Sequence, residues 1–263
     1  MDLLNGLTFY DSSGQYIADG SNVVVVNYMR GGPKSARCTA LVELGKYKLI
    51  MKNHHWLRLQ RRLTATMGRS PLSNEMVMLR RAQAVGFETA KLFAYGTRRR
   101  LGLIAQQVLL TFQIDGHQSL DSWLRTTDIS GCSMAAQGLA KLLGQVRSVG
   151  LADRDFGAHN LLVSSNTDQP GNLVWVDLEA AYSAPPRNAN ATCCTIGAAL
   201  ANWWICTGEE QDRLIAVFDV IKQHVPQPNT GWVTATNHIN RIIAKRVDRQ
   251  VCRNRANRLP DPL

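Results

Sequence analysis

The stretch "RDFGAHN" at residues 154–160 holds two short strings that overlap, Arg-Asp and Asp-Phe-Gly, and both use the aspartate Asp155. In the first string this carboxylate would handle a proton, and in the second string it would bind a metal ion. The two roles need different neighbours along the chain. The spacing of the surrounding residues therefore decides which role Asp155 has. That choice also decides which fold the sequence predicts.

The residues before this stretch argue against the metal-binding interpretation. That interpretation needs another aspartate roughly twenty residues upstream, with an asparagine five residues after it. The upstream candidate is Asp128, and the residue five positions later is Ser133, at the start of a predicted helix. We therefore treat the string Asp-Phe-Gly as a coincidence.

The residues after the stretch fit a catalytic role for Asp155. A predicted helix over residues 133–149 precedes it, and Asn160 follows it by five residues. The short apolar run "LLV", the turn "SSNTDQPGN" and a second strand that ends at Asp177 come next. Phosphoryl transfer needs mainly positioning and charge neutralisation. An aspartate can accept the proton of the acceptor hydroxyl, while an asparagine and a second carboxylate hold magnesium on the phosphates.

The first part of the chain offers the other residues that this chemistry needs. The run "LIMK" places Lys52 at the end of a predicted strand, and Glu75 lies early in the next predicted helix. Such a lysine binds nucleotide phosphates and such a glutamate holds the lysine in place. Lys46 and Lys48 are alternative candidates for this lysine, but they precede the most apolar part of the strand. The simpler alternative is a surface lysine and an acid that interacts with the helix dipole.

Periodicity predicts a strand-rich first part of the chain. Apolar runs and period-two alternation predict strands over 22–28, 39–44, 46–52, 90–96 and 103–112. Residues 73–85 are predicted to form a helix with Ser73 as its N-cap and Gly86 as its stop. We expect residues 54–56 to lie in a loop or at a helix start.

After the turn-rich segment 113–119 the pattern becomes helical. Helices are predicted over 119–127, 133–150, 195–208, 209–225 and 236–253. The sequence thus predicts an α+β, protein-kinase-like bilobal fold. The β-rich N-lobe would span 1–112 and bind the nucleotide, and the mostly helical C-lobe would span 113–263.

Composition and charge limit the class of protein. The formal net charge of +10 indicates an anionic partner. Residues 238–263 contribute seven Lys/Arg and two Asp, a net +5. No apolar run approaches the ~18–20 residues of a membrane-spanning helix, and the start of the chain lacks a secretory signal. The six cysteines show no metal-binding spacing. We expect a cytoplasmic protein.

These residues carry a resemblance to the bacterial lipopolysaccharide kinases, which phosphorylate heptose or Kdo sugars of the inner core and share the protein-kinase-like fold. The resemblance extends from about Arg37 to Trp203. It rests on "RCTALVELGKYKLIMKNH", "NEMVMLRRAQAVGFETAKLFAYG", "VLLTFQIDGHQSLDSWL", "LADRDFGAHNLLV" and "LVWVDLEAAY".

The resemblance implies ATP and Mg²⁺ as cofactors and a membrane-embedded glycolipid as acceptor. It makes Lys52 the phosphate lysine and Glu75 its partner. It also makes Asp155 the catalytic base, with Asn160 and Asp177 as the metal ligands.

Several positions depart from the family pattern or match it weakly. Asp153 stands where the family usually has a histidine, and "DLE" replaces Asp-Phe-Gly after the second strand. The segment "RGGPKS" offers Gly31 and Gly32 but no complete glycine-rich loop. We expect these glycines, together with Thr111 and Gln113 near the lobe boundary, to contact the nucleotide.

Other functions remain open at this point. A small-molecule kinase of the aminoglycoside or choline type would use the same Asp/Asn/Asp arrangement, although such kinases often have an acidic acceptor pocket. A non-catalytic kinase-like protein would bind nucleotide or a partner. Nucleic acid is not an expected partner, because the basic C-terminus lacks interleaved aromatic residues.

The basic C-terminal stretch supports a hypothesis about the membrane. On a helix, Arg241, Lys245, Arg249 and Arg253 would line up at four-residue spacing, apart from a stripe of Ile and Val. They would dock the protein on the inner face of the inner membrane, where the glycolipid acceptor lies. The alternative is a stripe packed on the helical lobe, with the charges merely solvated.

Overall fold

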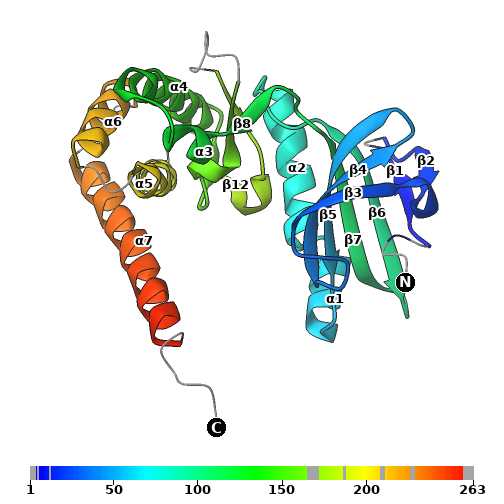
Figure 1. Ribbon diagram of the computed structural model, residues 1–263. Helices are drawn as coiled ribbons and strands as arrows, with labels where there is room; N and C mark the ends of the chain where they lie inside the picture. Colours follow the sequence, from blue (N-terminus) through cyan, green and yellow to red (C-terminus); the bar gives the residue numbers. More distant parts are fainter. Residues whose placement is uncertain are drawn as a thin grey trace. The chain divides into compact units, whose positions relative to one another are not determined.

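The computed structural model describes residues 4, 6–11, 13–164, 172–185, 188–207, 211–225 and 229–256. The chain forms two units. The first contains Met1–Gly116 and Val174–Ala181, and the second contains His117–Leu173 and Tyr182–Leu263. Strands dominate the first unit and helices the second, so the α+β class is confirmed (Figure 1). The sequence-based boundary at 112/113 would have put Asp177 in the second lobe, whereas the structure groups it with the first unit.

The first unit is built on a seven-stranded antiparallel sheet of order β2-β1-β6-β7-β5-β4-β3. Its strands are β1 (Thr8–Tyr10), β2 (Tyr16–Asp19), β3 (Val24–Arg30), β4 (Arg37–Leu44), β5 (Tyr47–His55), β6 (Leu92–Arg100) and β7 (Leu103–Phe112). A 3₁₀ turn, η1 (Gly20–Asn22), precedes β3, and two helices, α1 (Leu59–Thr66) and α2 (Pro71–Ala84), connect β5 to β6. The strand β5 lies between β4 and β7, so it is an interior strand of the sheet.

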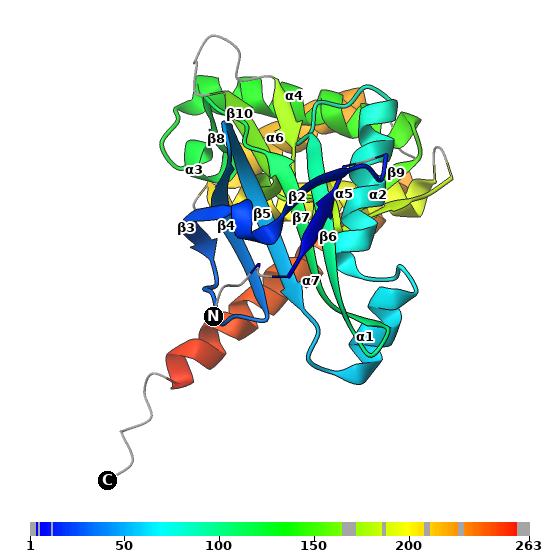
Figure 2. The same cartoon turned by 90° about the vertical axis from the view of Figure 1, so that its right-hand side faces the viewer.

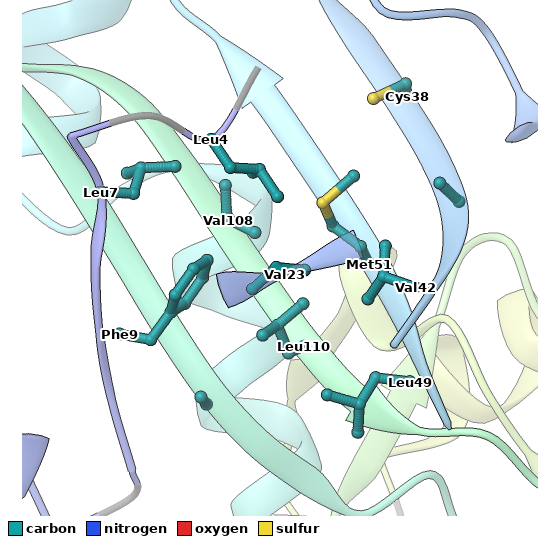
Figure 3. Packing of buried hydrophobic residues seen from close by; sticks show 12 residues of the cluster. Leu4, Leu7, Phe9, Val23, Cys38, Val42, Leu49, Met51, Val108 and Leu110 are labelled. Atoms are coloured by element: carbon teal, nitrogen blue, oxygen red, sulfur yellow. The ribbon is translucent and has the colours of Figure 1, made fainter. Parts of the chain in front are cut away.

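Figure 3 shows the apolar core of this unit, formed by side chains from most of its strands. Phe9, Leu49, Met51 and Leu110 are all fully buried in it. In β5 the buried residues alternate with Ile50 and Lys52, which are partly exposed. Because side chains alternate across a strand, this pattern turns Lys52 away from the apolar core.

The sequence predicted the five longer strands but missed β1, β2 and α1. The two strands have only three and four residues, too short for a clear alternation. In α1, Leu59 and Leu63 are the only large apolar residues. The strand β5 was expected to end at Lys52, but it continues to His55, because its pairing with β7 extends that far.

The predicted N-cap of α2 was also wrong. The helix begins at Pro71, and the hydroxyl of Ser70 accepts a hydrogen bond from the backbone N–H of Ser73 at 3.1 Å. Proline favours the first helical position because its φ angle is preset and it has no N–H to satisfy. The capping role therefore belongs to the residue before the proline.

The second unit contains helices and short strand pairs. Its helices are α3 (Leu120–Leu124), α4 (Ile129–Ser148), α5 (Ala189–Cys206), α6 (Gln211–His224) and α7 (Asn229–Ala256). Its short strands are β8 (His117–Ser119), β9 (Leu151–Asp153) and β10 (Leu161–Ser164); β10 pairs with β8, and β9 pairs with β12 (Ala181–Ser183). Between β9 and β10 lies a 3₁₀ turn, η2 (Ala158–Asn160). Asp128 caps α4 by accepting from the Gly131 N–H at 2.8 Å, a structural role that agrees with its exclusion from catalysis.

The helix α7 packs against α5, and Ile239 of the predicted stripe is buried. Arg241 and Lys245 are exposed, while the side chains of Arg249 and Arg253 lie outside the described residues. Within the described part of the chain, no helix combines the length and the apolar character needed to cross a bilayer.

Candidate active site

The first unit places Lys52 between two carboxylates. Its Nζ atom lies 2.7 Å from Oε1 of Glu75 on α2 and 2.7 Å from Oδ1 of Asp177. Glu75 is buried and the Lys52 side chain is 17% exposed. Three residues predicted from distant parts of the sequence thus form one cluster.

Asp177 reaches this cluster because the segment around it is tied to the first unit. It follows β11 (Leu173–Trp175) and precedes the 3₁₀ turn η3 (Leu178–Ala180). The Thr89 hydroxyl donates a hydrogen bond to the Trp175 carbonyl at 2.6 Å. Asp177 itself has φ 57° and ψ 64°, a left-handed conformation that few residues other than glycine adopt. Strained backbone of this kind is concentrated at functional sites.

Asn74 holds the other end of the same segment. Its side-chain amide donates to the carbonyls of Glu179 at 3.0 Å and Ala181 at 2.7 Å. Asn74 directly precedes Glu75 on α2. The helix therefore positions both the lysine and the aspartate segment through two adjacent residues.

The charges in this cluster stabilise one another. Burial lowers the pKa of Lys52, but Glu75 and Asp177 more than reverse this effect, so the pKa lies above its ordinary value. Burial raises the pKa of Glu75 to about 7, against the opposing attraction of Lys52. Lys52 is consequently a cation at neutral pH and is available to neutralise phosphate charge.

A pocket opens beside the cluster. It is lined by Arg30, Arg37, Cys38, Thr39, Lys52, His54, Asp177 and Glu179. Arg37 forms an ion pair with Glu179 at 3.2 Å. Burial, together with the positive charges of Arg37 and Lys52, lowers the pKa of His54 to about 3, so this imidazole is neutral. Basic side chains around one acidic cluster suit a polyphosphate that carries a cation.

The residues present fit a magnesium ion. Ligand atoms of Glu75, Asp177 and Glu179 lie within 4.8 Å of one another. Within the described part of the chain, Oε2 of Glu75 is buried without a hydrogen-bond partner. Carboxylate oxygens are the ligands that magnesium prefers, usually one or two of them together with phosphate oxygens.

The other residues predicted to contact the nucleotide do not line the pocket. Gly31 and Gly32 form the turn between β3 and β4, whereas the flanking Arg30 and Arg37 face the pocket. Thr111 is buried in β7, and the Gln113 N–H donates to the Lys48 carbonyl at 3.1 Å. Their contact with a nucleotide stays a prediction.

The second unit holds Asp155 and Asn160 on one loop. The Asn160 side-chain amide donates to the Asp155 carbonyl at 2.9 Å, which leaves its oxygen as the atom suited to a cation. The Asp155 carboxylate is 63% exposed, with Nε2 of His159 at 3.8 Å. Phe156 is fully buried, so the phenylalanine of the Asp-Phe-Gly string is a core residue.

Asp153 holds this loop in place from its buried side through hydrogen bonds. It is fully buried, and its Oδ1 accepts a hydrogen bond from the Asp155 backbone N–H at 2.8 Å. Its own N–H donates to the Thr195 hydroxyl on α5 at 3.0 Å. The residue that replaces the family's usual histidine thus fixes the backbone of the predicted catalytic residue.

Comparison with known proteins agrees with this geometry. A sequence model of the lipopolysaccharide kinase (Kdo/WaaP) family matches residues 21–190, more than half of the chain. The chain belongs to this family. No curated protein sequence matches it.

A solved structure described as "WaaP in complex with acyl carrier protein" matches 86% of this chain and 89% of its own. The TM-score is 0.55 and the sequence identity is 14%. The likeness at this identity concerns the fold, and it confirms the predicted kinase-like fold for this family member.

The sequence did not reveal every residue of the cluster. Asn74, Glu179, Arg37 and His54 were not predicted as site residues. All four lie in segments that resemble the family, but no spacing rule singled them out. Asn74 stands beside a predicted site residue, and that adjacency is the one signal that could have found it.

The brace at Asp153 leads to a prediction about stability. Asp153→Ala removes the buried carboxylate that accepts the hydrogen bond of the Asp155 N–H, so the free energy of unfolding should fall by about 1–3 kcal/mol. Asp153→Asn keeps an acceptor oxygen and should lose less. Urea unfolding measures both, with Asp219→Asn on the exposed side of α6 as the control. Equal stability of the Ala and Asn variants would contradict the brace.

Proposed function

We propose that this member of the lipopolysaccharide kinase family transfers the γ-phosphate of ATP to a hydroxyl of a Kdo or heptose sugar in the lipopolysaccharide inner core. The observation that carries the proposal is the Lys52 ammonium held between Glu75 and Asp177. A lysine so held is a fixed positive charge for nucleotide phosphates.

The residues of the first unit bind and neutralise the nucleotide. Lys52 contacts the α- and β-phosphates, and Glu75 keeps its ammonium in place. Asp177 holds magnesium, which when bound would neutralise charge on the phosphates. Arg30 and Arg37 add positive charge at the pocket wall. We assign the nucleotide to this unit for these reasons.

The residues of the second unit act on the acceptor. The exposed Asp155 carboxylate orients the sugar hydroxyl and accepts its proton as the oxygen attacks the γ-phosphorus. The bond from that phosphorus to the β–γ bridging oxygen then breaks, and ADP leaves. Asn160 offers its side-chain oxygen as a further magnesium ligand. Asp153 keeps the Asp155 backbone fixed, so that only the side chain of Asp155 has to be ordered for the reaction.

The proposed acceptor also indicates where in the cell the protein acts. A lipopolysaccharide precursor is a glycolipid, so we propose that the protein is cytoplasmic and peripheral on the inner face of the inner membrane. The exposed Arg241 and Lys245 of α7 support an attraction to that anionic surface.

The acceptor is tested directly. The protein is incubated with labelled ATP and truncated lipopolysaccharides that end at Kdo or at heptose, and the new phosphate is then located by mass spectrometry. We expect label on one of the two sugars. Label on an aminoglycoside or choline, with none on either glycolipid, would favour a small-molecule kinase instead.

The role of Asp155 predicts a loss of turnover. Asp155→Asn should leave ATP affinity nearly intact and lower turnover by roughly 10²–10⁴-fold, the usual contribution of general base help. Steady-state kinetics measure the effect, with Asp219→Asn as a matched control on the same unit. Retention of more than about a third of wild-type turnover would remove Asp155 from this role.

The role of Asp177 predicts a different pattern. Asp177→Ala should abolish activity and weaken magnesium-dependent ATP binding, because the phosphates lose their bridging cation. Calorimetric titration with ATP, with and without magnesium, measures this. Asp19→Ala, which alters an exposed aspartate of the same unit, should bind as the wild type does. ATP affinity indifferent to magnesium and to Asp177 would favour a non-catalytic nucleotide-binding protein.

A further inference from the structure

Figure 2 shows α1 beside the turn between β6 and β7 at one end of the first unit. Both elements expose large apolar side chains. The helix packs on β7, and the hydroxyl of Thr66 accepts a hydrogen bond from the Ile104 N–H at 2.9 Å. Within this unit the two elements are therefore fixed together. The apolar members, with their exposed fractions, are Leu57 (77%), Leu59 (63%), Leu63 (46%), Met67 (65%) and Leu101 (93%).

The helix turns its larger apolar residues away from the protein. Leu59, Leu63 and Met67 recur every four residues, so they share one face, and that face is exposed. Ala65 is the residue of α1 that packs inward, with Trp56 and Ile104. A surface helix normally buries its apolar stripe, so an inverted one indicates an occupant outside the chain.

Leu101 supplies an independent observation. It is 93% exposed and has φ 54°, and Gly102 after it has φ 77°. A two-residue hairpin turn with two positive φ angles normally has asparagine or aspartate at its first position, because a bulky side chain is strained there. This leucine accepts strain without burying its side chain in the protein.

In the two segments that carry these residues, the Asp, Glu, Lys and Arg side chains are all arginines. Residues 53–70 and 92–107 contain seven arginines and no aspartate or glutamate. Five of these arginines are exposed, namely Arg58, Arg61, Arg69, Arg99 and Arg100. Arg62 donates a hydrogen bond to the Trp56 carbonyl at 2.7 Å, and one guanidinium nitrogen of Arg98 is buried, so these two are not counted. We call the five apolar residues and the five exposed arginines the basic apolar patch.

We propose that the basic apolar patch docks the protein on an anionic phospholipid bilayer. Leu59, Leu63 and Leu101 enter the boundary between headgroups and acyl chains, and the arginines bind lipid phosphates. Apolar residues beside a dense positive charge are typical of protein surfaces that bind at the headgroup interface of an anionic bilayer. The proposal does not depend on phosphoryl transfer, and the surface differs from the C-terminal arginines of α7.

The apolar part is tested at constant net charge. Full-length protein is sedimented with vesicles of phosphatidylglycerol and phosphatidylethanolamine, and with phosphatidylcholine vesicles as the neutral reference. The triple variant Leu59→Gln, Leu63→Gln, Leu101→Asn should lower the partition coefficient on anionic vesicles at least about tenfold. The matched triple variant Met134→Gln, Ile215→Gln, Val233→Gln changes exposed apolar residues of the second unit and should bind as the wild type does.

The basic part is tested against the C-terminal helix. Arg58→Gln, Arg61→Gln, Arg100→Gln should remove most of the salt-sensitive binding to anionic vesicles. A second triple variant removes three positive charges from α7, with the substitutions Arg241→Gln, Lys245→Gln and Arg249→Gln. It should retain most of the salt-sensitive binding to anionic vesicles. A larger loss of vesicle binding in the α7 variant than in the patch variant would overturn the proposal.

Stability separates a docking role from a folding role. Leu101→Asn alone should raise the melting temperature, because asparagine tolerates the left-handed turn, and should still weaken vesicle binding. Vesicle binding unchanged in the apolar triple variant would overturn the proposal. So would a wild-type dimer in sedimentation equilibrium that this variant disrupts, because the patch would then be an interface between copies of the chain.

Discussion

The largely buried ammonium of Lys52, whose side chain is 17% exposed, is the constraint on which the first unit depends. A charge removed from water is costly unless it is paired, and the loss of one partner of such a pair costs about 3–5 kcal/mol. Lys52 meets this requirement with Glu75 and Asp177, each at 2.7 Å. The strand β5, the helix α2 and the segment 174–181 must therefore come together for the lysine to be accommodated.

This requirement explains features that would otherwise be unfavourable. Asp177 adopts a left-handed backbone conformation, which is compensated by the ion pair and by hydrogen bonds on either side of it. Thr89 holds the segment before Asp177, and Asn74 holds the segment after it. The same carboxylates that stabilise the lysine are the groups that suit a metal ion, so the structural and the proposed catalytic roles use one set of atoms.

The loop of the second unit relies on a buried acid instead of the usual histidine. Asp153 accepts the N–H of Asp155 and is anchored to α5 through Thr195. Gly157 lies so close to α5 that an added Cβ would come within 2.8 Å of the Asn202 side chain. The exposed carboxylate of Asp155 is thus carried by a backbone fixed on its inner side, which is the arrangement that preorganised proton transfer requires.

The sequence by itself determined the residues whose roles depend on local order along the chain. Period-two alternation marked the strand that carries Lys52, and the spacing of Asp155, Asn160 and Asp177 predicted which residue is the base and which residues are the metal ligands. Tertiary structure alone decided that Asp177 belongs with the first unit, that Asn74 holds its segment, and that Asp153 faces inward. The contacts of Asn74 join residues 105 and 107 positions apart. No periodicity encodes such contacts, because they depend on which distant segments pack together.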